Sequence, residues 1–278
     1  MRPKKIAIVG LGLMGGSLAA ACRRKFPSSR IIGISRNPKS LRYALKKKWI
    51  HGGTSSLSQG VSQADLVVLC SPVNTFVPLL SAINQAALPG TLVTDVGSAK
   101  GQVMKQIRKK KHESIKFVSA HPMVGSHQQG IHAADPFLYD KGITFVIREK
   151  NISPKSFRSI TSFWQQLSKR IFAVTAEEHD KIVSEISHLP HVLAACLMTA
   201  VNDKFLPFAG TGFRDVTRVA QGDPSVWVPI LSANQPAVRK ALRALQRRIG
   251  AFERTLAERK KDKLRTFLQK AARRRKQI

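Results

Sequence analysis

The sequence predicts an α/β protein in which a doubly wound, mostly parallel sheet is followed by an all-helical C-terminal part. Up to about residue 175, short continuous apolar runs alternate with helical segments, which is typical of parallel strands buried on both faces. Farther along, apolar residues recur at helical spacing and no run reads convincingly as a strand. We therefore divide the chain into a sheet domain, residues 1–174, and a helical domain, residues 175–278.

The strand candidates of the sheet domain share a continuous apolar run. They are residues 5–10, 30–35, 65–71, 91–97, 115–122, 142–149 and 170–175. Segments long enough for crossover helices lie between them, at residues 15–26, 38–49, 74–88 and 153–169. This repetition of strand, helix and strand predicts the doubly wound arrangement.

The helical domain opens on a long helical segment that begins at about residue 176. Thr175 is a suitable N-cap, with acidic residues in the turn that follows, and Pro190 is expected to kink or restart the helix. The final residues, 271–278, are expected to be a frayed end. Five apolar residues form one stripe on a later, cationic helix: Leu242, Leu245, Ile249, Phe252 and Leu256.

The chain is strongly basic, with 47 Lys and Arg against 16 Asp and Glu and a formal charge of +31. Such a balance is compatible with nucleic-acid binding. The bases are spread along the chain, however, and no helix-turn-helix, zinc-finger or RNP pattern accompanies them. A general basic bias, or attraction of anionic substrates, explains the charge at least as well, so we do not expect nucleic acid as a partner.

Cysteine usage and hydropathy favour a cytoplasmic protein. Cys22, Cys70 and Cys196 lack metal-ligand spacing and are expected to be reduced thiols. The first residues show no secretory pattern, and no stretch approaches the apolar length that spans a bilayer. We expect no membrane association.

The first strand candidate runs into a G-x-G-x-x-G pattern and then a helix of small residues. Gly10 permits a tight turn, Gly12 lets the backbone approach a pyrophosphate, and Gly15 lets helix and strand pack closely. The amides of the helix start, at Leu13 and Met14, would bind the phosphates. The pattern predicts a Rossmann-type dinucleotide-binding domain.

The end of the second strand candidate indicates which dinucleotide is bound. NAD sites usually carry Asp or Glu there, to bind the ribose 2′-hydroxyl. This chain has Ser35 and Arg36 instead, with Lys39 nearby. Because a guanidinium can pair with a 2′-phosphate, we predict that NADP is preferred and that NAD is possible. Alternatively, Arg36 is a solvated charge that does not discriminate.

Six motifs together resemble the prephenate/arogenate dehydrogenase family of tyrosine biosynthesis: GLGLMGGS, CSPV, DVGSAK, HPMVGSHQQG, SHLPH and GFRDVTRVAQGDPSVW. They span about residues 5–235, in the family's order. We see no chorismate mutase segment or ACT domain, so the form it resembles is monofunctional. The resemblance implies oxidative decarboxylation of prephenate to 4-hydroxyphenylpyruvate, or of arogenate to tyrosine, with hydride transfer to NAD(P). It also implies cofactor contacts at Ser71, Pro72 and Asp95.

The resemblance makes His121 the catalytic histidine. The chemistry needs a group that is neutral near pH 7 and accepts a proton, and the end of a sheet strand is where doubly wound folds bind ligands. The structural alternative is a strand-end histidine bonded to backbone. Ser98 matches the family serine that bonds this histidine and the substrate hydroxyl; it could also cap the helix that follows.

Substrate contacts are expected from the helical domain. Arg218 matches the family arginine that binds a substrate carboxylate, and Asp215 could orient its guanidinium. His191 matches a substrate-contacting histidine, and His188 is close enough to share a helical face with it. Trp227 is expected to wall the pocket, or to be core. No third ligand accompanies the two histidines, so we expect no metal.

One position departs from the family pattern. Many members read H-P-x-x-G-[ST]-E, and here the glutamate position is His127. Arogenate carries an ammonium where prephenate carries a keto group, and an acid would favour the ammonium. With His127 in the substrate site, the sequence leans toward prephenate.

Two other functions stay open. One is a different hydroxy-acid or imine dehydrogenase of the same two-part architecture, although such enzymes typically use a lysine in the helical half. The other is a basic Rossmann-derived protein that binds nucleic acid through its tail. We expect a homodimer formed through the helical domain, with the apolar stripe of residues 242–256 either at the interface or in the core.

Overall fold

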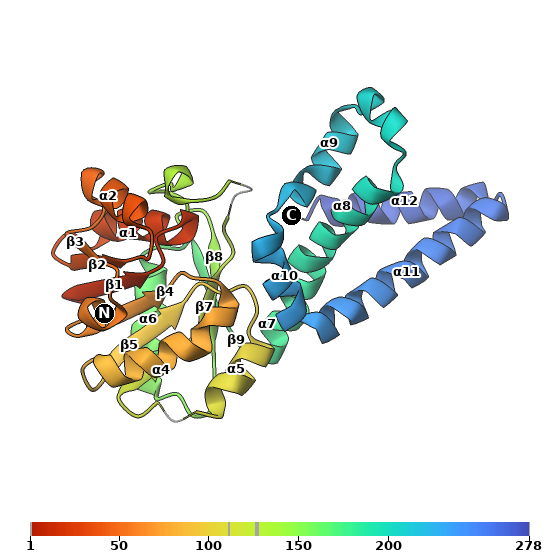
Figure 1. Ribbon diagram of the computed structural model, residues 1–278. Helices are drawn as coiled ribbons and strands as arrows, with labels where there is room; N and C mark the ends of the chain where they lie inside the picture. The colour runs from red at the N-terminus through yellow and green to blue at the C-terminus, as the bar shows by residue number, and fades with distance from the viewer. Residues whose placement is uncertain (1, 111, 126–127, 278) are drawn as a thin grey trace.

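The computed structural model describes residues 2–110, 112–125 and 128–277 (Figure 1). A sheet domain built from strands and helices occupies one side of the molecule, and a set of helices extends from it. This confirms the predicted fold class.

The main sheet has six parallel strands in the order β3-β2-β1-β4-β5-β6. The strands are β1 (Lys5–Val9), β2 (Arg30–Ile34), β3 (Gly52–Thr54), β4 (Leu66–Leu69), β5 (Thr91–Asp95) and β6 (Ile115–Phe117). β4 is buried at every position, as a strand covered on both faces should be. β3 was not predicted, because its sequence, Gly-Gly-Thr, offers no apolar run.

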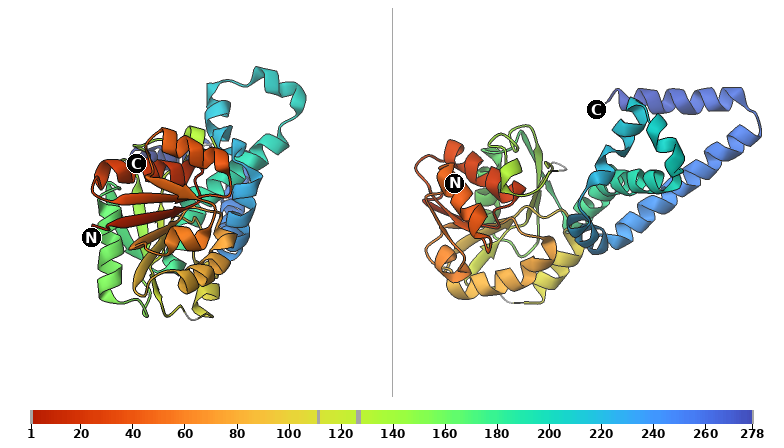
Figure 2. Two further views of the ribbon diagram at one scale, coloured as in Figure 1. Left: turned by 60° about the vertical axis from the view of Figure 1, so that its left-hand side comes forward. Right: turned by 45° about the horizontal axis from the view of Figure 1, so that its top comes forward.

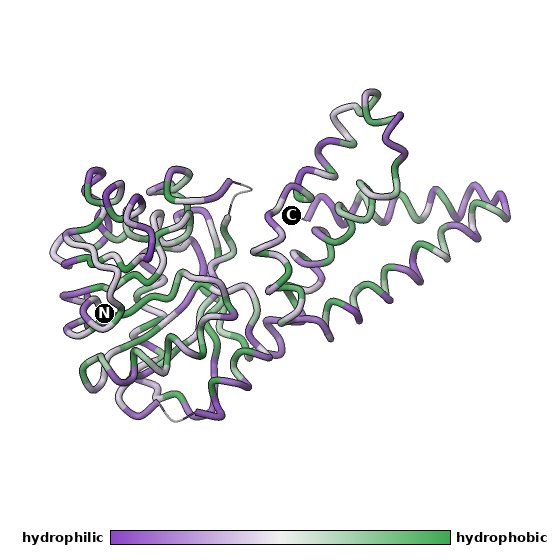
Figure 3. Tube along the Cα trace, in the orientation of Figure 1, coloured by the Kyte–Doolittle hydropathy of each residue, from purple (hydrophilic) through white to green (hydrophobic). Residues whose placement is uncertain are grey.

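Helices cover both faces of this sheet. α1 (Leu13–Lys25) and α6 (Pro154–Gln165) pack into one apolar core with β1 and β2. α3 (Leu57–Val61), α4 (Phe76–Ala86) and α5 (Gly101–Arg108) pack into the core on the other face. α2 (Pro38–Lys46) precedes β3. Figure 3 shows how apolar residues concentrate in the strands.

The predicted strand 115–122 is wrong as a single element. It divides into β6 of the main sheet and β7 (Ala120–Pro122), which belongs to a second sheet of order β7-β8-β9 with β8 (Ile143–Ile147) and β9 (Arg170–Val174). The division falls at Ser119, whose hydroxyl, together with the amide of Ala120, donates to the buried carboxylate of Asp95. These bonds turn the chain away from the main sheet, so His121 lies on the second one.

The helical domain begins directly after β9. Thr175 caps α7 (Ala176–Val183) in a capping box with Glu178, as predicted. A π-helical turn, Ser184–His188, then leads into α8 (Leu189–Ala200), which has Pro190 in its first turn. Pro190, which has no amide hydrogen to donate, lies just after this π-helical turn, and the helix continues through it from Ala176 to Ala200.

The remaining helices are α9 (Thr211–Thr217), the 3₁₀ turn η5 (Arg218–Gln221), α10 (Pro224–Ala233), α11 (Gln235–Ala257) and α12 (Lys261–Arg275). α11 runs away from the sheet domain, and α12 turns back toward that domain at a wide angle to α11 (Figure 2). Most of the tail that we expected to be frayed is thus helical.

α11 carries the predicted apolar stripe, and its members Ile249 and Leu256 are about half exposed. By helical spacing, Lys240, Arg243 and Arg247 project from the opposite side, where they help to line a shallow basic hollow.

Contrary to the sequence-based expectation, one helical stretch is long and apolar enough to cross a membrane. It is the continuous helix Ala176–Ala200, with a mean hydropathy of 1.3 in its most apolar window. That judgement concerns length and composition alone. The same stretch carries His179, Asp180 and His188, which are buried and bonded within the protein, as a helix of a folded domain would be.

We predict that Gly15→Ala destabilises the protein, because a Cβ at this position would lie 1.8 Å from the carbonyl oxygen of Gly10. The expected loss is about 3 kcal/mol or more of unfolding free energy, read as a lower Tm in calorimetry. Gly12→Ala is the matched control, because nothing lies within 4 Å of its Cβ position. Equal Tm values for the two variants would contradict the packing assigned to Gly15.

Candidate active site

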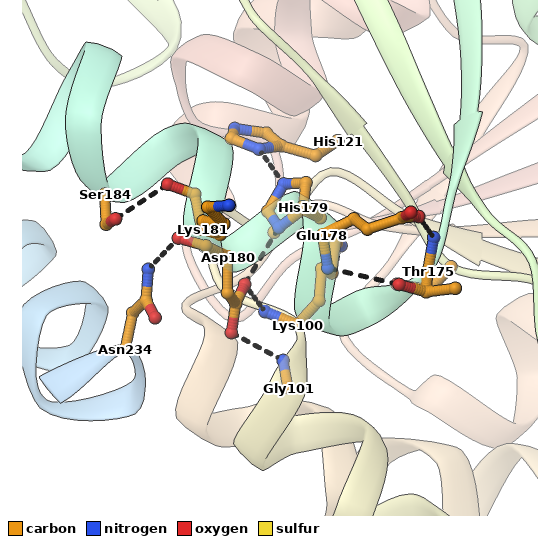
Figure 4. A network of polar contacts seen from close by, with 12 residues as sticks. Lys100, Gly101, His121, Thr175, Glu178, His179, Asp180, Lys181, Ser184 and Asn234 are labelled. Carbon is orange, nitrogen blue, oxygen red and sulfur yellow. Dashed lines mark hydrogen bonds and ion pairs between the residues drawn. The ribbon is translucent and has the colours of Figure 1, made fainter. Parts of the chain in front are cut away.

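His121 lies at the junction between the two domains. It is 6% exposed on β7, and its Nδ1 is 2.8 Å from Nε2 of His179 on α7 (Figure 4). The Nδ1 of His179 is in turn 2.8 Å from Oδ1 of Asp180. Burial, followed by the neighbouring His179, Lys100 and His188, holds the pKa of His121 well below 6.5. The imidazole is therefore neutral at pH 7.

Asp180 links the helical domain to the start of α5. Its Oδ1 accepts a hydrogen bond from the amide of Lys100 (2.9 Å) and its Oδ2 one from the amide of Gly101 (2.7 Å). These are amides that a helix leaves without partners in its first turn. The predicted capping by Ser98 is wrong: no side chain of the N-terminal loop caps α5, and Asp180 does so from another domain.

Beneath His121 lies a buried ion pair between Lys100 and Asp95, exposed by 1% and 0%. Lys100 Nζ also donates to the carbonyl of Ala120, 2.7 Å away, next to His121. Asp95 accepts from Ser119 and from the amides of Gly97 and Ala120. Its carboxylate is thus bonded within the protein, and the cofactor contact expected at Asp95 stays a prediction. The pair positions β7.

His188 lies beside the same site and is 1% exposed. Its Nδ1 is 3.2 Å from Nδ2 of Asn234, which also donates to the carbonyl of Asp180 (2.9 Å). Burial is the largest cause that lowers the pKa of His188 to about 4, and a hydrogen bond involving the backbone of Ser98 partly opposes it. This places Ser98, with a half-buried side chain, next to the histidine cluster.

His191 and Trp227 form a stacked pair, with ring centroids 3.6 Å apart and planes inclined by 6°. Gly222 makes room for them, because a Cβ there would meet Trp227 Nε1 at 2.3 Å. Trp227 also makes a T-shaped contact with His188, with the ring centroids 6.1 Å apart. The two expected substrate contacts therefore form one aromatic wall with His188.

Arg218, on η5, is exposed, and so are Arg214 and Asp215. Within the described residues no hydrogen bond or ion pair joins Arg218 to Asp215, so the predicted orientation of the guanidinium by that acid is not present. η5 packs against α8, which carries His191. Arg218 is thus an exposed cation on an element that packs against the helix of His191.

The loop after β7 reaches the helical domain through Gln129, whose side-chain amide donates to the carboxylate of Asp223, the N-cap of α10. The loop therefore extends toward the helix of Trp227. His127, the departure from the family pattern, lies outside the described residues.

The expected dinucleotide site lies at the carboxyl ends of β1, β2 and β4. Gly10 has φ +95°, and its Cβ position lies 2.9 Å from the carbonyl of Cys70, so this turn needs glycine. Gly12 faces open space, which means that the protein itself does not require a glycine there. A pyrophosphate that approaches the backbone here would require the glycine, because a side chain would stand in its way. The amides of Leu13 and Met14 follow at the start of α1, which has no side-chain cap.

The ends of the neighbouring strands complete this edge. Ser35 follows β2 and accepts from the amide of Asn37, and Arg36 is exposed beside it. Ser71 and Pro72 follow β4, and the amide of Ser71 lies 3.1 Å from the Cβ position of Gly10. No acid follows β2 directly. In the part of the chain that the structure describes, no group of three metal-binding side chains occurs.

Sequence reasoning missed His179, Asp180, Lys100 and Asn234. The signal for the first two was an adjacent His-Asp pair in the opening turns of α7, which we interpreted only as helix-start residues. Nothing in the sequence indicates that this turn lies against His121, 58 residues earlier.

Solved structures of 3-hydroxyisobutyrate dehydrogenases share the fold of this chain at low sequence identity. The enzyme of Salmonella typhimurium has a TM-score of 0.60 at 15% identity, over 87% of this chain and 88% of that one. This likeness concerns the fold alone.

Solved structures with stronger similarity cover almost the whole chain. Prephenate dehydrogenase from A. aeolicus, in complex with hydroxyphenyl propionate and NAD+, has a TM-score of 0.91 at 27% identity, over 99% of this chain and 98% of that one. Synechocystis arogenate dehydrogenase has a TM-score of 0.83 at 28% identity, over 99% and 100%.

Sequence comparison gives the family. A family model described as prephenate dehydrogenase, nucleotide-binding domain, matches residues 18–173, and one described as prephenate dehydrogenase, dimerization domain, matches residues 175–270. Prephenate dehydrogenase of Bacillus subtilis (strain 168) is 31% identical, over 95% of this chain and 70% of its own length. That of Lactococcus lactis is 32% identical over 83% and 65%. The chain belongs to the prephenate dehydrogenase family.

Proposed function

We propose that this dehydrogenase oxidises and decarboxylates prephenate, giving 4-hydroxyphenylpyruvate, with NADP as the preferred hydride acceptor. The observation that carries the proposal is the neutral, buried His121 at the domain junction, between a dinucleotide edge and an aromatic wall. The nicotinamide cofactor supplies the acceptor for the hydride that leaves the carbinol carbon. Loss of CO₂ then makes the ring aromatic, which drives the reaction.

In this proposal His121 takes the proton of the ring hydroxyl as the carbon–hydrogen pair of electrons leaves. A base must be unprotonated before it can accept, and the lowered pKa of His121 keeps it so at pH 7 and below. We assign to Ser98, beside His188, a hydrogen bond to the same hydroxyl. Arg218 is the cation available for a substrate carboxylate.

Relatives act on either of two substrates by their names, prephenate or arogenate, and one is called a cyclohexadienyl dehydrogenase, from Zymomonas mobilis. Arogenate, giving tyrosine, is therefore the alternative substrate. We favour prephenate over arogenate because His127 replaces the family glutamate, which would favour the ammonium of arogenate.

His121→Asn should abolish turnover of prephenate, because asparagine cannot act as the base. Cofactor affinity should stay within about twofold, because the substitution leaves the glycine turn unchanged. The expected loss of kcat is about 100-fold or more. Reduced-cofactor absorbance measures the rate, and fluorescence titration measures cofactor binding. If the His121→Asn variant turned over prephenate near the wild-type rate, His121 would be structural. If the wild-type protein were inactive on both prephenate and arogenate, the substrate assignment would be refuted.

Crossing both substrates with both cofactors tests the NADP preference. Removing a charge-assisted bond to the 2′-phosphate costs about 1.5–3 kcal/mol, so Arg36→Ala should raise the KM for NADP at least about tenfold and leave that for NAD nearly unchanged. Lys46→Ala, a cation in the last turn of α2, is the control and should change neither. The A. aeolicus relative holds NAD+, so a wild-type preference for NAD is the informative contrary result.

We further propose that the helical domain pairs with that of a second copy. It exposes several large apolar residues, including Phe208 (83%), Val228 (60%) and Ile186 (59%), which a partner would cover. The apolar window of the helix Ala176–Ala200 is part of this surface. The matching family description, a dimerization domain, supports the pairing.

Ile186→Glu should shift the protein from twice the chain mass of 30.7 kDa toward that mass, since a buried interface does not accept an unpaired carboxylate. Light scattering after size-exclusion chromatography measures the mass. Leu88→Glu, at a residue 54% exposed in the sheet domain, is the control and should remain dimeric. A wild-type mass of one chain would contradict the proposal.

A further inference from the structure

We infer that Asp180 and His179 are positioning residues that fix the tautomer of His121, so that its Nε2 carries the lone pair that accepts a proton. The inference rests on the proposed function, in which His121 is the base. It follows from the donors and acceptors along the chain of contacts from the start of α5 to β7.

The carboxylate of Asp180 determines which groups donate and which accept along this chain of contacts. The backbone amides of Lys100 and Gly101 can only donate, and both point at this carboxylate. They belong to the N-terminal end of α5, whose helix dipole also favours a negative charge. Both oxygens of Asp180 therefore act as acceptors, and the hydrogen in its contact with His179 comes from the histidine.

His179 must consequently carry its hydrogen on Nδ1, which lies 2.8 Å from Oδ1 of Asp180. The ring is fully buried, and burial lowers its pKa, an effect that Lys100 increases and that Asp180 and Asp95 partly oppose. A neutral imidazole has one N–H and one lone pair. The lone pair of His179 thus lies on Nε2.

That lone pair faces Nδ1 of His121 at 2.8 Å, so Nδ1 of His121 is the donor. His121 is neutral as well, with His179, Lys100 and His188 as its charged or titratable neighbours. Its remaining nitrogen, Nε2, is left as the acceptor. When Nε2 takes a proton, the imidazolium retains a hydrogen bond to His179, which Asp180 supports from behind (Figure 4).

The direct test is ¹⁵N NMR of histidine-labelled full-length protein, with His121 assigned by difference against His121→Asn. We expect a protonated Nδ1 and an unprotonated Nε2 at pH 7. The opposite tautomer in the wild type would overturn the inference. Because this readout needs no turnover, it is independent of the substrate assignment.

A matched pair of variants tests the consequence for the reaction. His179→Leu removes the acceptor, so kcat should fall about 100-fold while the KM for the cofactor changes less than twofold, and the tautomer signal should be lost. His179→Gln offers a carbonyl oxygen to Nδ1 of His121 and should recover at least tenfold of the loss. A His179→Leu enzyme that retains wild-type kcat and tautomer would overturn the inference, as would a glutamine variant no better than the leucine one. Asp180 variants are less suitable, because this carboxylate also caps α5.

Discussion

The arrangement of the site depends on one carboxylate, that of Asp180, which receives hydrogen bonds from both domains. Two backbone amides at the start of α5 belong to the dinucleotide-binding domain, and the imidazole of His179 belongs to the helical one. An isolated buried carboxylate would be costly, whereas one that accepts three hydrogen bonds is compensated. The same atoms therefore cap the start of α5, join two domains and position His179, which contacts His121.

A second buried pair, Lys100 and Asp95, supports the strand that carries His121. Lys100 and Asp95 are almost inaccessible to water, and between them they bond Ser119 and the backbone on both sides of Ala120. Breaking such a pair leaves an uncompensated buried charge. The strand β7 has only three residues and so makes few ladder hydrogen bonds. The contacts with Lys100 and Asp95 help to hold it in place.

How far the sequence predicts this structure depends on whether the signal is local. The glycine turn, the strands β1, β4 and β5, and the Thr175 cap are all patterns within about ten residues, and they were predicted correctly. The division of residues 115–122 was missed because it depends on Asp95, some 25 residues earlier. The same holds for α5, which is capped by a side chain 80 residues away, and for the His121–His179 contact. The residues themselves can be read from the sequence, but their proximity results from the packing of the two domains.

The amphipathic character of α11 explains how so basic a chain can associate with itself. Its apolar stripe and its row of Lys240, Arg243 and Arg247 lie on opposite sides of a helix about 10 Å across, which exceeds the Debye length of about 8 Å at physiological salt. Two copies that meet along the stripes would carry these cations outward, toward counterions. Repulsion between like charges would then be largely damped, and the excess of positive charge would surround the assembly without separating its halves.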